Sequence, residues 1–484
     1  MHYEPKKKSV KKHKVPDWFH DAKLGIFIHW GLYSVPAFAV TGLDLIETIK
    51  EEGFTGQFRK NPYAEWYLNS LRIEGTPTRE YHQKTYGKDF TYENFVPIFN
   101  EEIQRWDPEE MVEVFRQAGA KYVVLVTKHH DGFLLWPSEY TNPQKENYHA
   151  ERDIVGELTE AVKQKGMKMG FYYSGTLDWS FNPQPIKDII SFTTNGVMTP
   201  DYVEYANHHW YELIDKYDPL ILWNDIGYPP GTDVYEIFAY FYNKHPEGVI
   251  NDRWMQITKF MRKAIKFKPI AAIVKWAAKR AFVKGAAGMP TNIHYDFRTP
   301  EYTHLEKIST QKWESTRGIG NSFGYNRMEK AEDYLDPDDL IKMFIDIVSK
   351  NGNLLLNVGP KADGSIPEIQ KNVLLSLGGW LIVNGEGIYG TRPWIRAEGQ
   401  TTEGLEIRFT QKEERFYVFL MGIPSSSTLT IKDLKIKENA RITLLEGQEE
   451  VSWGQIGDDL TIDIGKNLPE SPALAFAITP KPQN

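Results

Sequence analysis

Residues 220–225, with the sequence LILWND, decide the fold class of this chain. Their apolar side chains are consecutive rather than alternating, which is typical of a strand buried on both faces of a parallel sheet. The run ends on a carboxylate, Asp225. In α/β barrels the carboxyl ends of the strands carry the catalytic groups, whereas a single Asp at a strand end is more often a turn or cap residue. The ends of the other strands therefore decide how Asp225 is interpreted.

Further apolar runs flank this one and alternate with helix-like segments. Asp107-Pro108 and Asp336-Pro337 each predict a helix start, with a capping carboxylate and a proline in the first turn. The repeated strand-and-helix units predict an α/β fold, a (β/α)8-like TIM barrel over residues 16–394. A doubly wound open sheet is the alternative, but no glycine-rich phosphate loop follows the first strand. Strands are expected at residues 25–30, 122–127, 167–174, 220–225, 248–252 and 353–358, and further helices at 154–164, 202–216 and 234–243.

The two ends of the chain differ from this central region. Residues 395–484 alternate apolar and polar side chains, as in Leu405-Ile407-Phe409 and Leu474-Phe476-Ile478. This period of two predicts a small antiparallel β-sandwich, in which we find no candidate catalytic group. Residues 1–15 form a basic tail with six lysines in the first 14 positions.

Composition excludes several classes of protein. With 484 residues, 41% hydrophobic and 25% charged, the chain is typical of an ordinary globular protein. It has no cysteine, which excludes disulfides and thiolate ligands. The basic tail lacks the apolar stretch of a secretory signal, and no run approaches the roughly 20 apolar residues of a membrane span. We therefore expect a cytoplasmic protein, or a secreted or periplasmic one if a signal has been removed.

A basic insertion, residues 256–292, interrupts the predicted barrel. It contains nine Lys and Arg residues and no Asp or Glu, so that the net charge of −8 leaves −17 on the rest of the chain. Its pattern predicts two short amphipathic helices separated at Pro269, with apolar faces at Phe260, Ala264 and Phe267 and at Ile270, Val274, Ala277 and Ala281. We interpret it first as an insertion packed on the barrel surface. An interfacial anchor on anionic lipid and a contact with an acidic partner or subunit are the alternatives, and no nucleic-acid motif accompanies it.

Polar side chains lie at the ends of several predicted strands. If the strands close into one barrel, these side chains converge on one mouth. Adjacent histidines on an extended segment point to opposite sides and chelate poorly, and the chain has no HExxH motif, so we expect neither a metal nor another cofactor. Neutral imidazoles that bind hydroxyl groups fit the pattern better. The residues concerned are His29, Lys128-His129-His130-Asp131, Tyr172, Asp225 and Arg253.

Carboxylate chemistry remains after these exclusions. Hydrolysis of an acetal needs one ionised carboxylate at the anomeric carbon and one protonated carboxyl group to release the leaving oxygen. Asp225 suits the first role, because Arg253 and the histidines could keep it ionised. Spacing alone does not identify the second group, for which the candidates are Glu47, Glu51, Glu65, Glu301 and Glu306.

At this point several motifs resemble the α-L-fucosidases of glycoside hydrolase family 29. The combination of KHHDGF (residues 128–133) with LWND (residues 222–225) is highly specific for that family, and the likeness covers the whole predicted barrel. The other matching stretches are WFHDAKLGIFIHWGLYSVP (18–36), NPYAEWY (61–67), FYYSGTLDW (171–179), NDRW (251–254), RGIGNSFGYNR (317–327) and LLLNVGPKADGSIP (354–367).

The resemblance implies an exo-acting, retaining α-L-fucosidase that releases terminal L-fucose through a covalent fucosyl-enzyme intermediate. It makes Asp225 the nucleophile and, from its context after the sixth strand, Glu301 the general acid/base. A fucosylated glycan or glycoside is the implied substrate, and a homo-oligomer is plausible. A fucose-binding protein without activity and a metal-dependent barrel hydrolase are the rival readings. The implied sugar-binding residues are His29, Glu65, Trp66, His129, His130, Tyr172, Trp223, Arg253 and Phe323.

Overall fold

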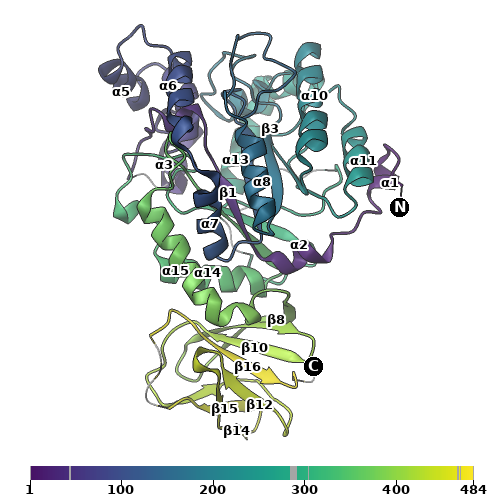
Figure 1. Ribbon diagram of the computed structural model, residues 1–484, viewed down its shortest axis with the longest axis vertical. Coiled ribbons are helices and arrows are strands. Elements are labelled where there is room, and N and C mark those ends of the chain that lie inside the picture. The colour runs from purple at the N-terminus through teal and green to yellow at the C-terminus, as the bar shows by residue number, and fades with distance from the viewer. Residues whose placement is uncertain are drawn as a thin grey trace.

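The computed structural model describes residues 2–42, 45–283, 292–302, 305–465, 468 and 470–482, with side chains for all of these except residues 45–47 and 281–283. A barrel wrapped by helices occupies one half of the molecule, and a β-sandwich lies below it in Figure 1. The predicted fold class, a (β/α)8-like domain followed by an antiparallel sandwich, is confirmed.

Seven parallel strands form the wall of the barrel, in the order β5-β4-β3-β2-β1-β7-β6. Their side chains are buried almost throughout, as consecutive apolar runs require when helices cover the outer face. Six of the seven were predicted; β6, which carries Glu314 and Arg317, was not. The strands are β1 (Leu24–Ile28), β2 (Tyr122–Lys128), β3 (Lys168–Ser174), β4 (Ile221–Asp225), β5 (Val249–Ile250), β6 (Trp313–Gly318) and β7 (Gly352–Val358).

A short extended segment, residues 296–302, fills the eighth position between β5 and β6. On one side the Asp296 backbone N–H donates to the carbonyl of Ile250, and Asn251 forms a parallel bridge with Phe297. On the other side Arg298 and Glu301 form parallel bridges with Trp313 and Thr316 of β6. The barrel therefore closes, but isolated bridges rather than a regular ladder hold its last seam.

Helices cover the barrel, and several begin as their sequences predict. The Asp107 carboxylate accepts hydrogen bonds from the backbone N–H groups of Glu109 and Glu110, and Asp336 caps its helix in the same way. The helices are α1 (Lys7–Val10), α2 (Asp17–Ala22), α3 (Leu45–Arg59), α4 (Tyr67–Arg72), α5 (Pro77–Thr85), α6 (Phe95–Glu102), α7 (Pro108–Gln117), α8 (Ile154–Gln164), α9 (Ile189–Thr194), α10 (Pro200–Tyr217), α11 (Val234–Lys244), α12 (Lys259–Ile265), α13 (Lys268–Val283), α14 (Pro337–Ser349) and α15 (Glu368–Asn384). In the part of the chain that is described, no helix has the length and apolar character to cross a bilayer.

The C-terminal strands form two antiparallel sheets around a separate apolar core. One sheet has the order β13-β12-β16-β10-β9-β8 and the other β11-β15-β14. Their bounds are β8 (Arg392–Gln400), β9 (Glu406–Lys412), β10 (Arg415–Leu420), β11 (Thr428–Ile431), β12 (Arg441–Leu444), β13 (Glu449–Val451), β14 (Trp453–Ile456), β15 (Asp459–Asp463) and β16 (Leu474–Thr479).

The sandwich packs against the end of the barrel at which the strands begin. Lys350, two residues before β7 starts, forms an ion pair of 2.7 Å with Glu398 of β8. Arg408 of β9 pairs with Asp346 at the end of α14 at 2.5 Å. The opposite end, where the strands finish, is therefore left open for a functional site.

Candidate active site

The ends of strands β1 to β5 bring their polar side chains to one mouth. Asp225 lies beside Ser174 across β4 and β3, and Trp223 lies beside Tyr172 one layer below. His29 follows β1, and its ring lies 5.7 Å from the rings of both His129 and Tyr172. The structure thus brings together the strand-end residues that the sequence indicated, with two exceptions.

Lys128 and Asp131 point away from this group. Lys128 is fully buried and forms an ion pair of 2.8 Å with Asp178, and it also contacts the hydroxyl of Tyr202. Asp131 accepts a hydrogen bond of 2.8 Å from the hydroxyl of Tyr92. Both support the strand end from behind instead of lining the mouth.

The Asp225 carboxylate has two donors and little contact with solvent. Its Oδ2 accepts a hydrogen bond of 2.8 Å from the Tyr172 hydroxyl, and its Oδ1 accepts one of 2.9 Å from Nη1 of Arg253. Burial by itself would raise the pKa of Asp225, but the charge of Arg253 and these hydrogen bonds hold that pKa below its ordinary value. Asp225 is therefore ionised at neutral pH.

Arg253 links the two carboxylates of the site. The same Nη1 atom that bonds Asp225 lies 2.6 Å from Oε1 of Glu301. Its other nitrogens donate to the hydroxyl and carbonyl oxygens of Thr299, each at 2.8 Å, and its guanidinium lies 4.7 Å from the centre of the Trp223 ring. Thr299 and Glu301 belong to the segment that closes the barrel, so the last seam of the fold also positions the second carboxylate.

This shared nitrogen limits the separation of the two carboxylates. Oδ1 of Asp225 lies 2.9 Å from it and Oε1 of Glu301 lies 2.6 Å from it, so the two oxygens are at most about 5.5 Å apart. Retaining glycosidases place their carboxyl groups about 5–5.5 Å apart, and inverting ones about 6.5–9.5 Å. This upper limit lies below the inverting range and is compatible with a retaining mechanism.

The histidines of the mouth are neutral and hold defined tautomers. Asn357 donates its amide to the carbonyl of Phe323, so its Oδ1 accepts from Nδ1 of His29 at 2.6 Å. Ser174 donates to the carbonyl of Leu177 and accepts from Nδ1 of His130 at 2.6 Å. Burial lowers the pKa of His29 to about 3 and that of His130 to about 4. Both rings thus keep a lone pair on Nε2, which can accept a hydrogen bond from a hydroxyl group.

His129 lies between these two rings. Its ring centre is 4.0 Å from that of His130, and burial lowers its pKa well below the usual value. Its Nδ1 is buried and has no hydrogen-bond partner among the described residues. A buried polar atom without a partner is costly, and a hydroxyl group of a bound ligand would satisfy it.

Glu65, Trp66 and Phe323 complete the mouth. Glu65 is buried, and its Oε2 accepts a hydrogen bond of 2.8 Å from the backbone N–H of Gly324. Burial raises the pKa of Glu65 to about 7, with a smaller contribution from the charge of Glu301. The Trp66 ring meets the His130 ring edge-on at 5.3 Å, and Phe323 lies 5.0 Å from His29. Of the other glutamates considered, Glu51 and Glu306 are exposed, and the side chain of Glu47 lies outside the described residues.

The chain turns sharply after Asp225. Ile226 adopts φ of 55° and Gly227 a φ of 75°. A β-branched residue in this region costs about 1–3 kcal/mol, and such strain is often found next to functional groups. The hydroxyl of Thr176 donates to the Ile226 carbonyl, and the Gly227 N–H donates to the carbonyl of Arg253. These bonds fix the backbone that carries the carboxylate.

Four residues of the site escaped the sequence analysis. Glu314 of β6 accepts hydrogen bonds from the Trp223 indole at 3.1 Å and the Tyr122 hydroxyl at 2.5 Å, beneath Asp225. The others are Ser174, Thr299 and Asn357, which orient His130, Arg253 and His29. Asn357 gave the clearest signal, since it is a polar residue in the apolar run of β7. The others depend on which strands are neighbours, and a sequence pattern does not reveal this.

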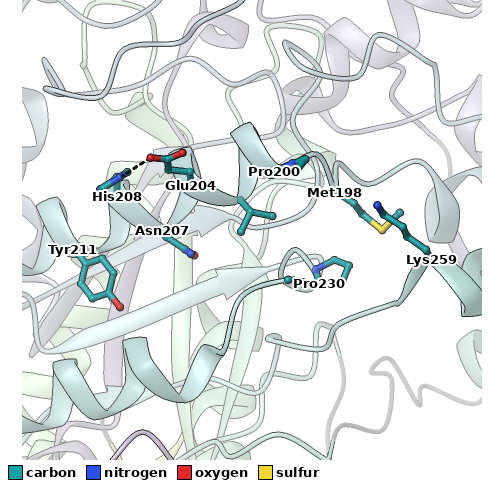
Figure 2. A pocket seen from close by; sticks show the side chains of 10 residues that line it. Met198, Pro200, Glu204, Asn207, His208, Tyr211, Pro230 and Lys259 are labelled. Atoms are coloured by element: carbon teal, nitrogen blue, oxygen red, sulfur yellow. Dashed lines mark ion pairs between the residues drawn. The ribbon is translucent and has the colours of Figure 1, made fainter.

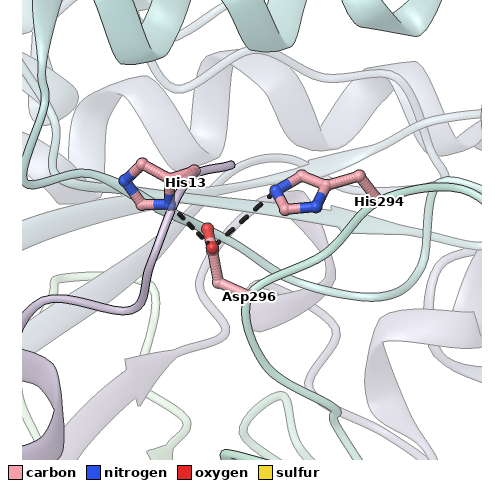
Figure 3. A group of neighbouring side chains, drawn as sticks. All are labelled: His13, His294 and Asp296. Atoms are coloured by element: carbon pink, nitrogen blue, oxygen red, sulfur yellow. Dashed lines mark hydrogen bonds and ion pairs between the residues drawn. The ribbon is translucent and has the colours of Figure 1, made fainter. Parts of the chain in front are cut away.

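Among the residues that the structure describes, one group of three potential metal ligands comes together. It consists of His13, His294 and Asp296, whose ligand atoms lie within 4.8 Å of one another where the closing segment begins (Figure 3). Nδ1 of His13 lies 2.8 Å from Asp296, Nε2 of His13 lies 3.1 Å from the Pro246 carbonyl, and Tyr242 donates to Asp296 at 2.7 Å. Burial opposes a charge on His13, but its bond to Asp296 raises the pKa of His13. A protonated His13 satisfies every contact, so this group is well explained as a hydrogen-bond network that fastens the N-terminal tail.

An open hollow of about 700 Å³ lies beside α10, between its first turns and the loop that follows β4 (Figure 2). Its polar lining includes Glu204 and His208, which lie 3.5 Å apart. The described residues that line it are Met198, Pro200, Val203, Glu204, Asn207, His208, Tyr211, Pro230, Gly231 and Lys259. None of the predicted catalytic or sugar-binding residues is in this described lining, so the hollow is separate from the mouth.

Comparison with known proteins identifies the family. Residues 1–386 match the family model described as Alpha-L-fucosidase. The chain belongs to the α-L-fucosidase family. The α-L-fucosidase of Dictyostelium discoideum is 32% identical over 460 residues, which cover 92% of this chain and 86% of the relative. The human tissue α-L-fucosidase is 30% identical over 497 residues, covering 99% of this chain and 91% of the relative.

Solved α-fucosidases also share the fold. The Thermotoga maritima α-fucosidase in complex with a mechanism-based inhibitor superposes with a TM-score of 0.83 at 42% identity, over 99% of this chain and all of that one. The same enzyme in complex with fucose gives a TM-score of 0.82 at 41% identity, with the same coverage. The fucosidase family therefore accounts for the barrel and the sandwich together, since the match extends through both.

Proposed function

We propose that this protein is an exo-acting, retaining α-L-fucosidase that releases terminal L-fucose from fucosylated glycans or glycosides. One observation carries the proposal. Two carboxylates, Asp225 at the end of β4 and Glu301 in the segment that closes the barrel, meet at one nitrogen of Arg253, no more than about 5.5 Å apart at their nearest oxygens. A double displacement needs its two carboxyl groups this close, whereas an inverting mechanism needs them farther apart. Membership of the fucosidase family, with relatives solved with fucose and with a mechanism-based inhibitor, supports the same reaction.

Asp225 is the proposed nucleophile. Arg253 and Tyr172 keep it ionised and fix its two oxygens, so that it can attack the anomeric carbon and form a fucosyl ester. Because both donors are in place before the substrate arrives, little reorganisation is needed during the attack. The strained turn at Ile226 adds to this pre-organisation.

Glu301 is the proposed acid/base. In the first step it protonates the departing glycosidic oxygen, and in the second it removes a proton from the water that hydrolyses the ester. Its side chain is 34% exposed, whereas that of Asp225 is 11% exposed, so Glu301 has the better access to the leaving group and to water. Arg253 holds it close to Asp225.

Glu65 is the competing candidate for the acid. Its pKa of about 7 keeps a proton on the carboxyl group near neutral pH, which a general acid requires. However, it is only 3% exposed, and Gly324 and Ser322 already engage one of its oxygens. These contacts favour a role in binding the sugar, in which Glu65 accompanies Trp66 and the three histidines.

The test is chemical rescue of an Asp225→Gly variant. Removal of the carboxylate leaves space beneath the anomeric carbon, and azide supplied in solution fills the nucleophile's place. We expect recovery of activity on an activated aryl fucoside, with a fucosyl azide of inverted anomeric configuration as the product. If azide leaves the residual rate unchanged while the variant still binds fucose, Asp225 is not the nucleophile.

A further inference from the structure

The two helices of the basic insertion carry a surface that catalysis does not use. Six of the sixteen large hydrophobic side chains that are exposed in the described part of the chain lie on α12 and α13 or between them. A concentration of this kind marks an interaction site, whereas single exposed apolar residues are common. The six are Phe260, Met261, Phe267, Ile270, Ile273 and Trp276.

The opposite face of these helices fixes them to the barrel. Arg262 is buried and donates to the carbonyls of Thr194 and Gly196 at the end of α9. Lys275 pairs with Asp188 at 3.2 Å, and Lys279 donates to the carbonyl of Lys50 in α3 at 2.8 Å. Figure 1 places α13 with α3 in the barrel half of the molecule, away from the sandwich. The insertion is therefore a docked element with one free face.

The faces of α12 and α13 that pack on the barrel differ from the apolar faces that the sequence pattern predicted. Ala271, Val274 and Ala278 are the half-buried residues of α13, whereas Ile270 and Ala277, expected on the packed face, are exposed. At about 100° per residue, Ile273 and Trp276 lie on the side opposite Val274 and Ala278. Phe260 is 80% exposed and Phe267 63%, although both were expected to pack. The largest apolar side chains thus face outward.

Positive charge surrounds the strip of six exposed apolar side chains on and between α12 and α13. The exposed basic residues beside it are Lys259, Lys263, Lys266, Lys268 and Arg280, and residues 255–293 contain no acidic residue. Aromatic and aliphatic side chains bordered by lysines are typical of helices that lie in the interface of an anionic membrane. A bilayer adapts to the protein and needs no complementary groove, so exposed apolar side chains on two neighbouring helices can enter it together.

The strip also has a fixed relation to the mouth. Phe192 of α9, on which the insertion docks, packs against Trp66 with ring centres 6.3 Å apart, and Trp66 meets His130 at 5.3 Å. The insertion therefore lies at the rim of the end at which the strands finish.

We propose that α12 and α13 form a docking surface for an anionic phospholipid bilayer, with Phe260, Phe267, Ile273 and Trp276 entering the interface and the surrounding lysines contacting the headgroups. The site described above would then act close to the membrane plane. This inference is independent of the proposed fucosidase reaction, because it concerns residues outside the mouth.

The test is cosedimentation of the full chain with vesicles. We expect binding to phosphatidylcholine vesicles that contain roughly one-third phosphatidylglycerol at about 0.05 M salt, and at least about tenfold weaker binding at about 0.5 M salt or to phosphatidylcholine alone. Phe267→Ser with Trp276→Ser should weaken binding at least about tenfold, and Lys263→Gln with Lys266→Gln and Lys268→Gln should do the same. Turnover of a small aryl fucoside in solution should stay as in the parent protein.

The matched control is Ile382→Ser with Ile456→Ser, which removes two side chains of 85% and 70% exposure away from the insertion. It should bind vesicles like the parent protein. Failure of the parent protein to bind anionic vesicles at low salt would overturn the proposal, as would equal losses in the control. If the parent protein is an oligomer that the Phe267→Ser and Trp276→Ser variant dissociates, the strip is an interface between copies and the membrane proposal is wrong.

Discussion

The two ends of the barrel carry similar ion-pair clusters that have different environments. At the sandwich end, Asp346 is bound by both Lys350 and Arg408, and these two cations also reach Glu398. At the mouth, Arg253 joins Asp225 and Glu301, and the neighbouring His29 and His130 keep free acceptor atoms on their Nε2 nitrogens.

The difference lies in the hydrogen-bonding capacity that remains. The cluster at the sandwich end pairs the buried Asp346 with cations from the end of α14 and from β9, so it joins two parts of the fold. The cluster at the mouth keeps acceptors aimed into the site and a carboxylate that only two groups restrain. Buried charge alone therefore does not identify an active site, whereas buried charge with unused acceptors does.

Asp225→Asn and Asp346→Asn test this comparison directly, and they should give the largest effects. Asp225→Asn should lower kcat/KM at least about 10³-fold per folded molecule, because it removes the proposed nucleophile. Asp346→Asn should cost about 3 kcal/mol of folding free energy, because Arg408 and Lys350 lose a buried partner. Turnover per folded molecule should remain that of the parent protein. The comparison fails if Asp346→Asn reduces that turnover as strongly as Asp225→Asn does.

Substitutions of the two glutamates sharpen the description of the mouth. Glu301→Ala should lower the rate on substrates with poor leaving groups by about 10²–10⁴-fold, and the rate on activated aryl fucosides far less, because only the poor leaving groups need protonation. Glu65→Gln should lower both rates in similar proportion. If instead Glu65→Gln slowed the poor leaving groups far more than the activated ones, Glu65 would be the acid. In that case Glu65→Gln should also remove a decline in rate above about pH 7 that the parent protein shows.

The acid limb of the pH profile tests the burial of the histidines. An imidazole is an acceptor at Nε2 only above its pKa, and burial lowers the pKa of His130 to about 4. As the pH falls, kcat/KM on an aryl fucoside should therefore hold until the pH approaches about 4 and drop below it, about tenfold per pH unit. A decline that begins near pH 6.5, the value of a solvated histidine, would contradict this account.

Ser174→Ala should give the smallest effect. It removes the acceptor that fixes the tautomer of His130, and we expect kcat/KM to fall by about 3- to 10-fold, mostly through KM. Ser349→Ala is the matched control at the sandwich end, since Ser349 is also buried and donates to a backbone carbonyl. Its kinetics should equal those of the parent protein. Equal effects on the two kinetic profiles would mean that Ser174 acts only through packing.

The sequence predicted the parts of the fold that follow a simple period. Apolar runs such as residues 122–127 and 220–225 are strands, and the polar residues at their ends meet at the mouth. The two parts of the barrel wall that the sequence analysis did not predict, β6 and the closing segment, have no such period. β6 is polar because Glu314 faces the barrel interior, and the closing segment contains Pro300 and is held only by isolated bridges.

The orientation of α13 and the position of Glu301 were also not given by a local residue pattern. Residue spacing shows that α13 is amphipathic, but it does not show which side meets the barrel, so the predicted face was rotated. The position of Glu301 depends on how a long insertion returns to the barrel, and only the resemblance to the family indicated it. The roles of Asp225, Glu301 and the sugar-binding residues remain predictions that the kinetics above address.

Trapping of the covalent intermediate is the most direct test of the central claim, that Asp225 attacks the anomeric carbon. The protein would be treated with 2-fluoro-fucosyl fluoride, digested, and its peptides mapped by mass spectrometry. The account predicts one fluorofucosyl adduct, on Asp225, that forms as activity is lost and disappears as activity returns. An adduct on another residue, or inactivation without any adduct, would contradict it.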